Sequence, residues 1–155
     1  MRSTATEIDA HNATEEQEMK VLLNRYKNIA VVGCSRDPRK AAHTVPKFMK
    51  EKGYKIIPVN PNAEEIFGEK TYGSLMKIPE PIAKQIEVVN VFRPSDEAVE
   101  VVKQAVDLKV RFGKLKGVWL QEGIVSKEAA GIARRYGLMI VMDRCIKVEY
   151  QKMWG

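Results

Sequence analysis

Five short runs of apolar residues recur along the chain, and each is followed by glycine, proline or a polar residue. The runs occupy residues 28–32, 55–59, 87–92, 117–120 and 138–142. They are rich in valine and isoleucine and show little alternation between apolar and polar positions. Strands of a parallel sheet that is covered on both faces have this pattern, since neither face meets water. The pattern therefore predicts about five parallel strands.

Stretches with helical periodicity separate most of these runs. Residues 43–52 carry apolar side chains on one face and stop before a glycine, and residues 147–154 predict a short closing helix. Ser95 and Ser126 stand at N-cap positions of two further helices. Residues 62–85 hold glycines and prolines, which predicts a loop-rich crossover with one short helix. Alternation of strands and helices predicts an α/β fold, with a doubly wound parallel sheet between two helical layers.

The segment before the first strand divides into two parts. Residues 1–13 are polar and lack periodicity, so we expect a flexible tail. Thr14 begins a Thr-Glu-Glu-Gln sequence with capping-box spacing, and an amphipathic pattern follows it. This predicts an extra N-terminal helix packed against the sheet. We expect a single domain over residues 14–155.

Composition narrows the classes of function. Apolar residues make up 45% of the chain and charged residues 30%, which is ordinary for a soluble globular protein. No stretch approaches the ~20 apolar residues of a membrane helix, and the first residues lack the apolar core of a secretory signal. We therefore expect a cytoplasmic protein without a membrane partner.

The net charge of +6 suits an anionic ligand, and phosphates are the obvious candidates. The basic residues are spread along the chain without a block, and neither zinc-ligand spacing nor an RNP-type aromatic pair is present. A nucleic-acid partner is therefore not expected, and no metal site is predicted.

The residues directly after the runs are the candidates for chemistry, because open parallel sheets bind ligands outside the carboxyl ends of their strands. Gly33 follows the first run and precedes a helix, whose free N–H groups suit a phosphate. Arg36, Arg39 and Lys40 add positive charge there. The G-x-G-x-x-G fingerprint is absent, and the second run ends at Asn60 without the carboxylate typical of NAD sites. These absences argue against an NAD dehydrogenase.

Five segments at these positions together resemble the small single-domain CoA-binding proteins, which are similar to the nucleotide-binding domain of the succinyl-CoA synthetase α subunit. The segments are residues 31–38, 59–62, 91–94, 119–124 and 142–145. The resemblance covers roughly residues 20–150. It implies a Rossmann-like domain that binds coenzyme A, or an acyl-CoA, across the carboxyl ends of the strands.

The resemblance also implies a role for each loop. The first loop would hold the ADP phosphates, the second would shape the adenosine side, the third would line the path of the pantetheine arm, and the fourth would face the same groove. The residues are Gly33, Cys34, Ser35, Arg36 and Lys40 in the first loop; Val59, Asn60 and Pro61 in the second; Phe92, Arg93 and Pro94 in the third; and Gln121, Glu122 and Gly123 in the fourth. Cys34 departs from the family pattern, in which a small residue such as alanine is usual, and so does Asn90, where an acidic residue is often found.

The synthetases use a histidine from another domain, and neither His11 nor His43 has a matched nucleophile. The expected function is therefore non-catalytic binding or regulation. The alternative is an enzyme that acts on an acyl-CoA or another nucleotide cofactor through Cys34 or Cys145. Both cysteines follow strands and are expected on the ligand side, where a thiolate would exchange disulfides with the CoA thiol. A buried, inert cysteine is the competing interpretation.

Three further side chains near the strand ends allow more than one role. Asp143 and Arg144 form either a catalytic pair or a structural ion pair that ties the fifth strand to its loop. Trp119 is expected to pack inside the protein, and to lie close enough to the groove to report on ligand binding. The acyl group, the oligomeric state and any protein partner stay open.

Overall fold

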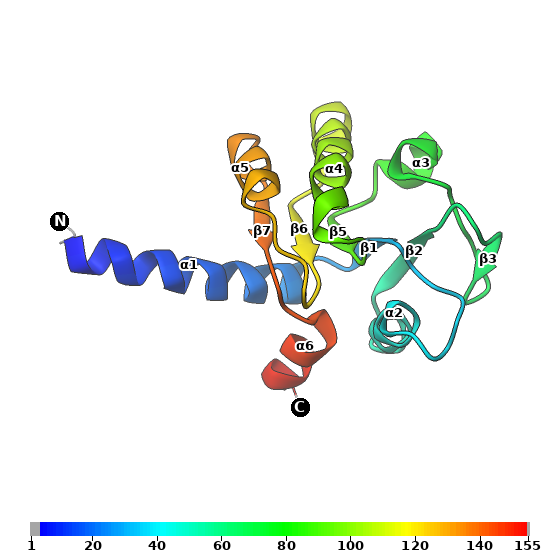
Figure 1. The fold of residues 1–155 in the computed structure, drawn as a ribbon, viewed down its shortest axis with the longest axis horizontal. Coiled ribbons are helices and arrows are strands. Elements are labelled where there is room, and N and C mark those ends of the chain that lie inside the picture. Colours follow the sequence, from blue (N-terminus) through cyan, green and yellow to red (C-terminus); the bar gives the residue numbers. More distant parts are fainter. Residues whose placement is uncertain (1–3, 155) are drawn as a thin grey trace.

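The computed structural model describes residues 4–154 and contains a five-stranded parallel sheet (Figure 1). Its strands are β1 (Asn28–Val32), β2 (Lys55–Val59), β5 (Val88–Val91), β6 (Gly117–Leu120) and β7 (Met139–Val141). They lie in the order β2-β1-β5-β6-β7, and each neighbouring pair is parallel. All five predicted strands are present, and two of them are shorter than their apolar runs.

Helices cover both faces of the sheet (Figure 1). The longer ones are α1 (Thr4–Arg25), α2 (Ala41–Glu51), α4 (Ala98–Phe112), α5 (Lys127–Arg135) and α6 (Ile146–Trp154). The side chains of α4 and α5 pack on one face, and those of α1, α2 and α6 pack on the other. This confirms the predicted three-layer, Rossmann-like doubly wound architecture with an extra N-terminal helix. No helix within residues 4–154 has the length and apolar character that crossing a membrane requires.

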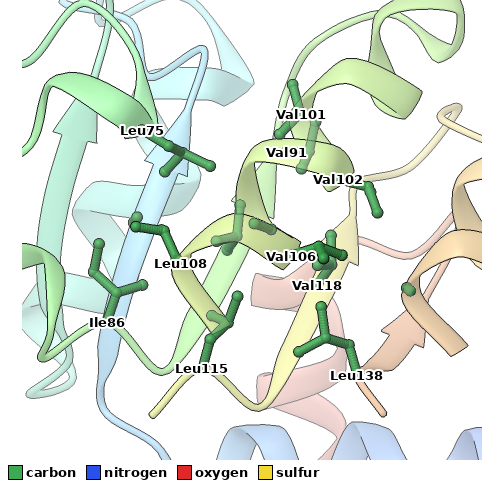
Figure 2. Close-up of a cluster of buried hydrophobic side chains, with 14 of the residues drawn as sticks. Leu75, Ile86, Val91, Val101, Val102, Val106, Leu108, Leu115, Val118 and Leu138 are labelled. Carbon is green, nitrogen blue, oxygen red and sulfur yellow. The ribbon is translucent and has the colours of Figure 1, made fainter. Parts of the chain in front are cut away.

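The two cores follow from the apolar runs. On the face under α4, Val102 and Val106 meet Val91 of β5 and Val118 of β6 (Figure 2). On the opposite face, a second cluster joins α1, α2 and α6 to the sheet, and Trp119 lies within it with none of its surface exposed. The prediction that Trp119 packs inside is therefore confirmed.

The start of α1 differs from the prediction. The helix begins at Thr4, and Thr14 lies within it. Residues 4–13 contain alanines and no glycine or proline, so nothing in them stops a helix from extending past the capping-box sequence. The predicted helix start at Thr14 is wrong. Residues 1–3 of the expected tail lie outside the described residues, and the flexibility of residues 4–13 stays a prediction.

The crossover between β2 and β5 holds more structure than the sequence indicated. The predicted short helix is present as a 3-10 turn, η1 (Leu75–Lys77), and a single helical turn, α3 (Glu80–Ala83), follows it. A small hairpin of β3 (Glu65–Ile66) and β4 (Glu69–Lys70) precedes both. Strands of two residues are too short for an alternating pattern to reveal.

The two predicted N-caps have different outcomes. Ser126 caps α5, because its hydroxyl accepts a hydrogen bond of 3.1 Å from the N–H of Ala129. Ser95 begins a 3-10 turn, η2 (Ser95–Glu97), that leads into α4, and it does not cap the helix. Its hydroxyl instead accepts a hydrogen bond of 3.0 Å from the N–H of Val125, in the loop after β6. The prediction for Ser95 is wrong because a distant loop competes for the same hydroxyl.

We expect Gly117→Ala to lower the free energy of unfolding by about 1–3 kcal/mol, the usual cost of overpacking a core. A Cβ at Gly117 would lie 2.8 Å from Leu22 Cδ2 and 3.1 Å from the Met139 carbonyl oxygen, so the buried Leu22 side chain and the backbone of β7 would have to shift. Gly131→Ala in α5 is the matched control: nothing lies within 4 Å of an added Cβ, and alanine there should stabilise by about 0.5–1 kcal/mol. Urea unfolding measures both. Equal effects of the two variants would contradict the packing argument.

Candidate functional site

The strand order creates a crevice at the carboxyl ends of β1 and β5. The chain leaves β1 towards β2 on one side and later returns to β5 on the other side of β1. Loops that diverge in this way leave room for a ligand. We call the five loops at this edge the carboxyl rim: residues 33–40, 60–62, 92–95, 121–125 and 142–145.

Gly33 allows the first and third rim loops to approach each other. Its φ is +88°, and its N–H donates a hydrogen bond of 3.0 Å to the Val59 carbonyl. A Cβ at this position would lie 3.0 Å from Arg93 Cδ and 3.2 Å from the carbonyl carbon of Phe92. Both the left-handed backbone and the close approach therefore favour glycine.

The backbone of Ser35 is held by α2 on both sides. Its N–H donates to the Ala42 carbonyl at 3.0 Å, and its own carbonyl lies 2.7 Å from His43 Nδ1. The Ala42 carbonyl is free for this contact because Pro46, four residues later, has no N–H to donate. Pro46 lies inside the helix, because α2 begins at Ala41, two residues before the predicted start.

Cys34 does not reach the ligand side. None of its surface is exposed, its side chain belongs to the core beneath α2, and burial raises the pKa of its thiol to about 12. The prediction that Cys34 emerges beside the phosphate turn is therefore wrong, and its thiol is neutral at pH 7. Cys145 is partly buried and, unlike Cys34, lines a cavity at the rim.

The first rim loop carries exposed positive charge. Arg36 and Lys40 are exposed and form no ion pair among the side chains that the structure describes, residues 15–154. Arg39 instead pairs with Asp37, and Nε and Nη2 each donate hydrogen bonds of 3.0 Å to its carboxylate. These bonds from the Arg39 side chain, with a further one from its backbone, lower the pKa of Asp37. The unpaired charge of this loop therefore resides on Arg36 and Lys40.

Asn60 ties the second rim loop to the first. Its Nδ2 donates a hydrogen bond of 2.8 Å to the Cys34 carbonyl, and its Oδ1 accepts one of 2.7 Å from the N–H of Asn62. The Val59 side chain is buried in the core, so this residue offers its backbone alone. A cavity of about 590 Å³ lies beside Asn60 and Pro61; it is also lined by Ala63, Glu64, Glu65, Lys70, Thr71 and Gly73.

The third and fourth rim loops enclose a second cavity, of about 350 Å³. Its lining is mostly apolar and comes from Ala41, Val45, Phe92, Arg93, Pro94, Gln121, Glu122, Ile124 and Cys145. Gln121 is buried, and its carboxamide is hydrogen-bonded to that of Asn90 at 2.8 Å. Arg93 donates to Glu97 Oε1 at 2.6 Å, so part of its charge is matched.

The structure thus brings the predicted site residues into neighbouring groups. Phe92, Arg93, Pro94, Gln121 and Glu122 line the apolar cavity, and Asn60 and Pro61 line the other. Gly33, Ser35, Arg36 and Lys40 form the first loop, and Gly123 lies at the tip of the fourth. The side chains of Cys34 and Val59 point into the core.

Sequence reasoning missed three apolar members of the cavity, namely Ala41, Val45 and Ile124. Only their positions in the sequence could have marked them as cavity residues. Ala41 and Val45 lie at the start of the helix after the first loop, and Ile124 follows Gly123 in the fourth loop. An apolar residue that lines a ligand cavity has the same sequence pattern as one that fills a core, so its type alone carries no signal.

Asp143 and Arg144 do not pair with each other. Arg144 Nη2 lies 3.3 Å from Glu15, and Nη1 lies 4.0 Å from Glu149, so this side chain links α1 to α6. Asp143 instead accepts a hydrogen bond of 2.7 Å from the N–H of Gly123. The predicted ion pair is therefore absent from the described residues. The fifth strand is tied to the neighbouring loop by a carboxylate-to-backbone bond instead.

Comparison with known proteins gives consistent matches over most of the chain. The family model described as CoA binding domain matches residues 27–151. The uncharacterized protein YneT of Bacillus subtilis is 39% identical over 133 residues, which cover 86% of this chain and 92% of YneT. The α subunit of the ADP-forming acetate–CoA ligase II of Pyrococcus furiosus is 34% identical over 79% of this chain, which spans 27% of that subunit. A solved structure of a hypothetical protein from Pyrococcus horikoshii OT3 superimposes with a TM-score of 0.80, at 37% identity, over 90% of this chain and 92% of that one.

The two cysteines should differ sharply in reactivity. We expect iodoacetamide to modify Cys145 and to leave Cys34 unmodified in the folded protein at pH 8, because Cys34 is inaccessible and its pKa is about 12. Mass spectrometry of tryptic peptides measures the modification, and full labelling of both residues in urea is the control. Modification of Cys34 at the rate of Cys145 would contradict the observed burial.

Proposed function

Because the chain belongs to the family of CoA-binding domains, we propose that it binds coenzyme A or an acyl-CoA along the carboxyl rim without catalysing a reaction on it. The family match confirms the resemblance drawn from the sequence and coenzyme A as the predicted cofactor. The placement of the ligand on particular residues, and the non-catalytic role, are our proposals.

The proposed position of coenzyme A on the carboxyl rim rests on one observation. Ala41 is the first residue of α2 and also lines the apolar cavity, so the start of a helix and an apolar cavity adjoin. Coenzyme A has the matching order of groups, because its charged phosphates are followed by the largely uncharged pantetheine arm. A ligand with this order of groups can place its phosphates at the start of α2 and its less polar arm in the apolar cavity at the same time.

The first rim loop would hold the phosphates. At the start of α2, the His43 N–H donates a hydrogen bond of 2.9 Å to the Lys40 carbonyl, whereas the N–H groups of Ala41 and Ala42 have no backbone acceptor among the described residues. The dipole of the helix favours negative charge at this end. Arg36 and Lys40 are exposed beside it and are free of ion pairs among the described side chains. Ser35 and Asn60 hold the loop in place through backbone bonds, so little ordering is left for the ligand to impose.

The apolar cavity would hold the pantetheine arm. Its volume of about 350 Å³ lies near the lower end of the range for ligand pockets, which suits part of a large ligand better than the whole. Val45, Phe92 and Ile124 supply apolar surface. The cavity beside Asn60 and Pro61 would receive the adenosine part, at the end of β2 where Rossmann-like folds place the ribose.

The non-catalytic role rests on the chemistry of the rim. The Cys34 thiol is buried and neutral, so it offers no nucleophile to a ligand at the rim. Cys145 supports a second candidate function, because it lines the cavity proposed for the pantetheine arm. In that case the Cys145 thiolate would attack CoA disulfide, form a mixed disulfide with one CoA and release the other as a thiolate. Intact mass after incubation with CoA disulfide tests this, with Cys145→Ser as the control.

Calorimetry with CoA, acetyl-CoA, NAD and NADP tests the proposed function. We expect the two CoA compounds to bind and NAD to bind far more weakly, because the end of β2 lacks the carboxylate that accepts from the ribose of NAD.

The double variant Arg36→Ala/Lys40→Ala should weaken CoA binding by about tenfold or more and flatten its salt dependence. Lys84→Ala/Lys114→Ala removes the same charge from exposed positions that precede β5 and β6, at the opposite edge, and should change affinity little. Equal loss in both double variants would contradict the phosphate assignment, and equal affinity for NAD and CoA would contradict the proposed ligand.

A further inference from the structure

Asp143 combines an unusual backbone with a specific contact. Its φ is +59°, a left-handed conformation that non-glycine residues rarely adopt. It follows β7 at the carboxyl rim, and its side chain is exposed rather than packed in the core. Strained backbone of this kind persists where the surroundings over-determine it, and ligand sites are common among such places.

Both hydrogen bonds of Asp143 within the described residues reach the fourth rim loop. Its Oδ1 accepts a hydrogen bond of 2.7 Å from the N–H of Gly123, and its own N–H donates one of 3.2 Å to the Ile124 carbonyl. The next residue in the chain is held by the strand that precedes the fourth loop. The Arg144 carbonyl accepts a hydrogen bond of 2.7 Å from Nε1 of Trp119 in β6. Two neighbouring loops are thereby held together at their tips.

The held loop forms a wall of the apolar cavity. Gln121, Glu122 and Ile124 line it from one side, and Cys145, two residues after Asp143, lines it as well. Gly123 itself has φ +85° and nothing within 4 Å of where a Cβ would stand, so no packing acts at this residue. The two ends of the loop are held elsewhere, Gln121 by Asn90 and Val125 by Ser95. The contacts from Asp143 therefore hold the tip of the wall between these two anchors.

We propose that Asp143 is a positioning residue for the ligand site: its left-handed backbone aims the carboxylate at Gly123 and thereby sets the cavity wall formed by residues 121–124. The inference rests on the proposed function, since the wall matters for binding if the pantetheine arm occupies this cavity. The negative charge of Asp143 offers no direct benefit to an anionic ligand, because like charges repel. Its benefit to binding is the position of the loop.

Three substitutions separate the two properties of Asp143. Asp143→Asn keeps an acceptor oxygen and a residue type that tolerates the left-handed backbone. Asp143→Gly keeps the backbone but removes the acceptor. Asp143→Ala removes both, and it adds backbone strain that should lower its melting temperature. Asp107→Ala, which removes an exposed carboxylate paired with Arg111 on α4, is the charge-matched control.

Two measurements report on the series. Amide exchange of Gly123 by NMR in ligand-free protein shows whether the loop is held, and calorimetry with CoA shows whether its position matters for binding. We expect the Asn variant and the Asp107→Ala control to bind within about twofold of the unaltered protein. The Gly and Ala variants should lose protection at Gly123 and bind CoA about three- to tenfold more weakly, the usual scale for one hydrogen bond.

Each contrary result has a definite meaning. Wild-type affinity and exchange in the Gly variant would overturn the proposal, because Asp143 would then serve the backbone conformation alone. An Asn variant as weak as the Gly variant would overturn it in favour of a role for charge, and lost protection without lost affinity would show that the wall does not matter to the ligand. If the unaltered protein does not bind CoA, the proposed function and the ligand part of this inference both fail. The Gly123 exchange series would still decide whether Asp143 holds the loop.

Discussion

Helices cover both faces of the central sheet, so the side chains of its strands have almost no access to water; Val31 and Val89, for example, expose none of their surface. Polar groups cannot be placed on such faces without a large desolvation cost. Within the sheet, exposed polar and charged groups are therefore confined to the edges where the strands begin and end. The strand order then selects one edge, because the loops after β1 and β5 diverge on opposite sides of the switch point.

The carboxyl rim is held together by bonds from side chains to backbone groups of other loops. Asn60 bonds to the Cys34 carbonyl, Ser95 to the N–H of Val125, and Asp143 to the N–H of Gly123. In each case the two partners come from different loops. Such bonds fix the loops before a ligand arrives and so reduce the conformational entropy that binding must overcome.

The same arrangement separates two chemical surroundings within one crevice. Glycine at position 33 lets the first loop lie against Phe92 and Arg93, which brings the charged loop close to the walls of the apolar cavity. Burial removes Cys34 from this chemistry and leaves Cys145 at the cavity. The crevice thus offers positive charge, free N–H groups and apolar surface in sequence, in the order that a phosphate-bearing ligand with a long, less polar arm requires.

The amino-acid sequence alone determined the strands, the helix capped by Ser126, the doubly wound fold and which loops lie at the carboxyl ends of the strands. These features depend on apolar periodicity and on backbone preferences of neighbouring residues, which are local properties. Tertiary structure decided the properties that depend on distant partners: Ser95 bonds to Val125 instead of capping α4, and Arg144 pairs with α1 and α6 instead of Asp143. It also decided which cysteine faces the cavity, since both follow strands and the packing of each loop sets the direction of the side chain. Distant contacts of this kind leave no periodic signal along a single chain, because their energies depend on residues that only folding brings together.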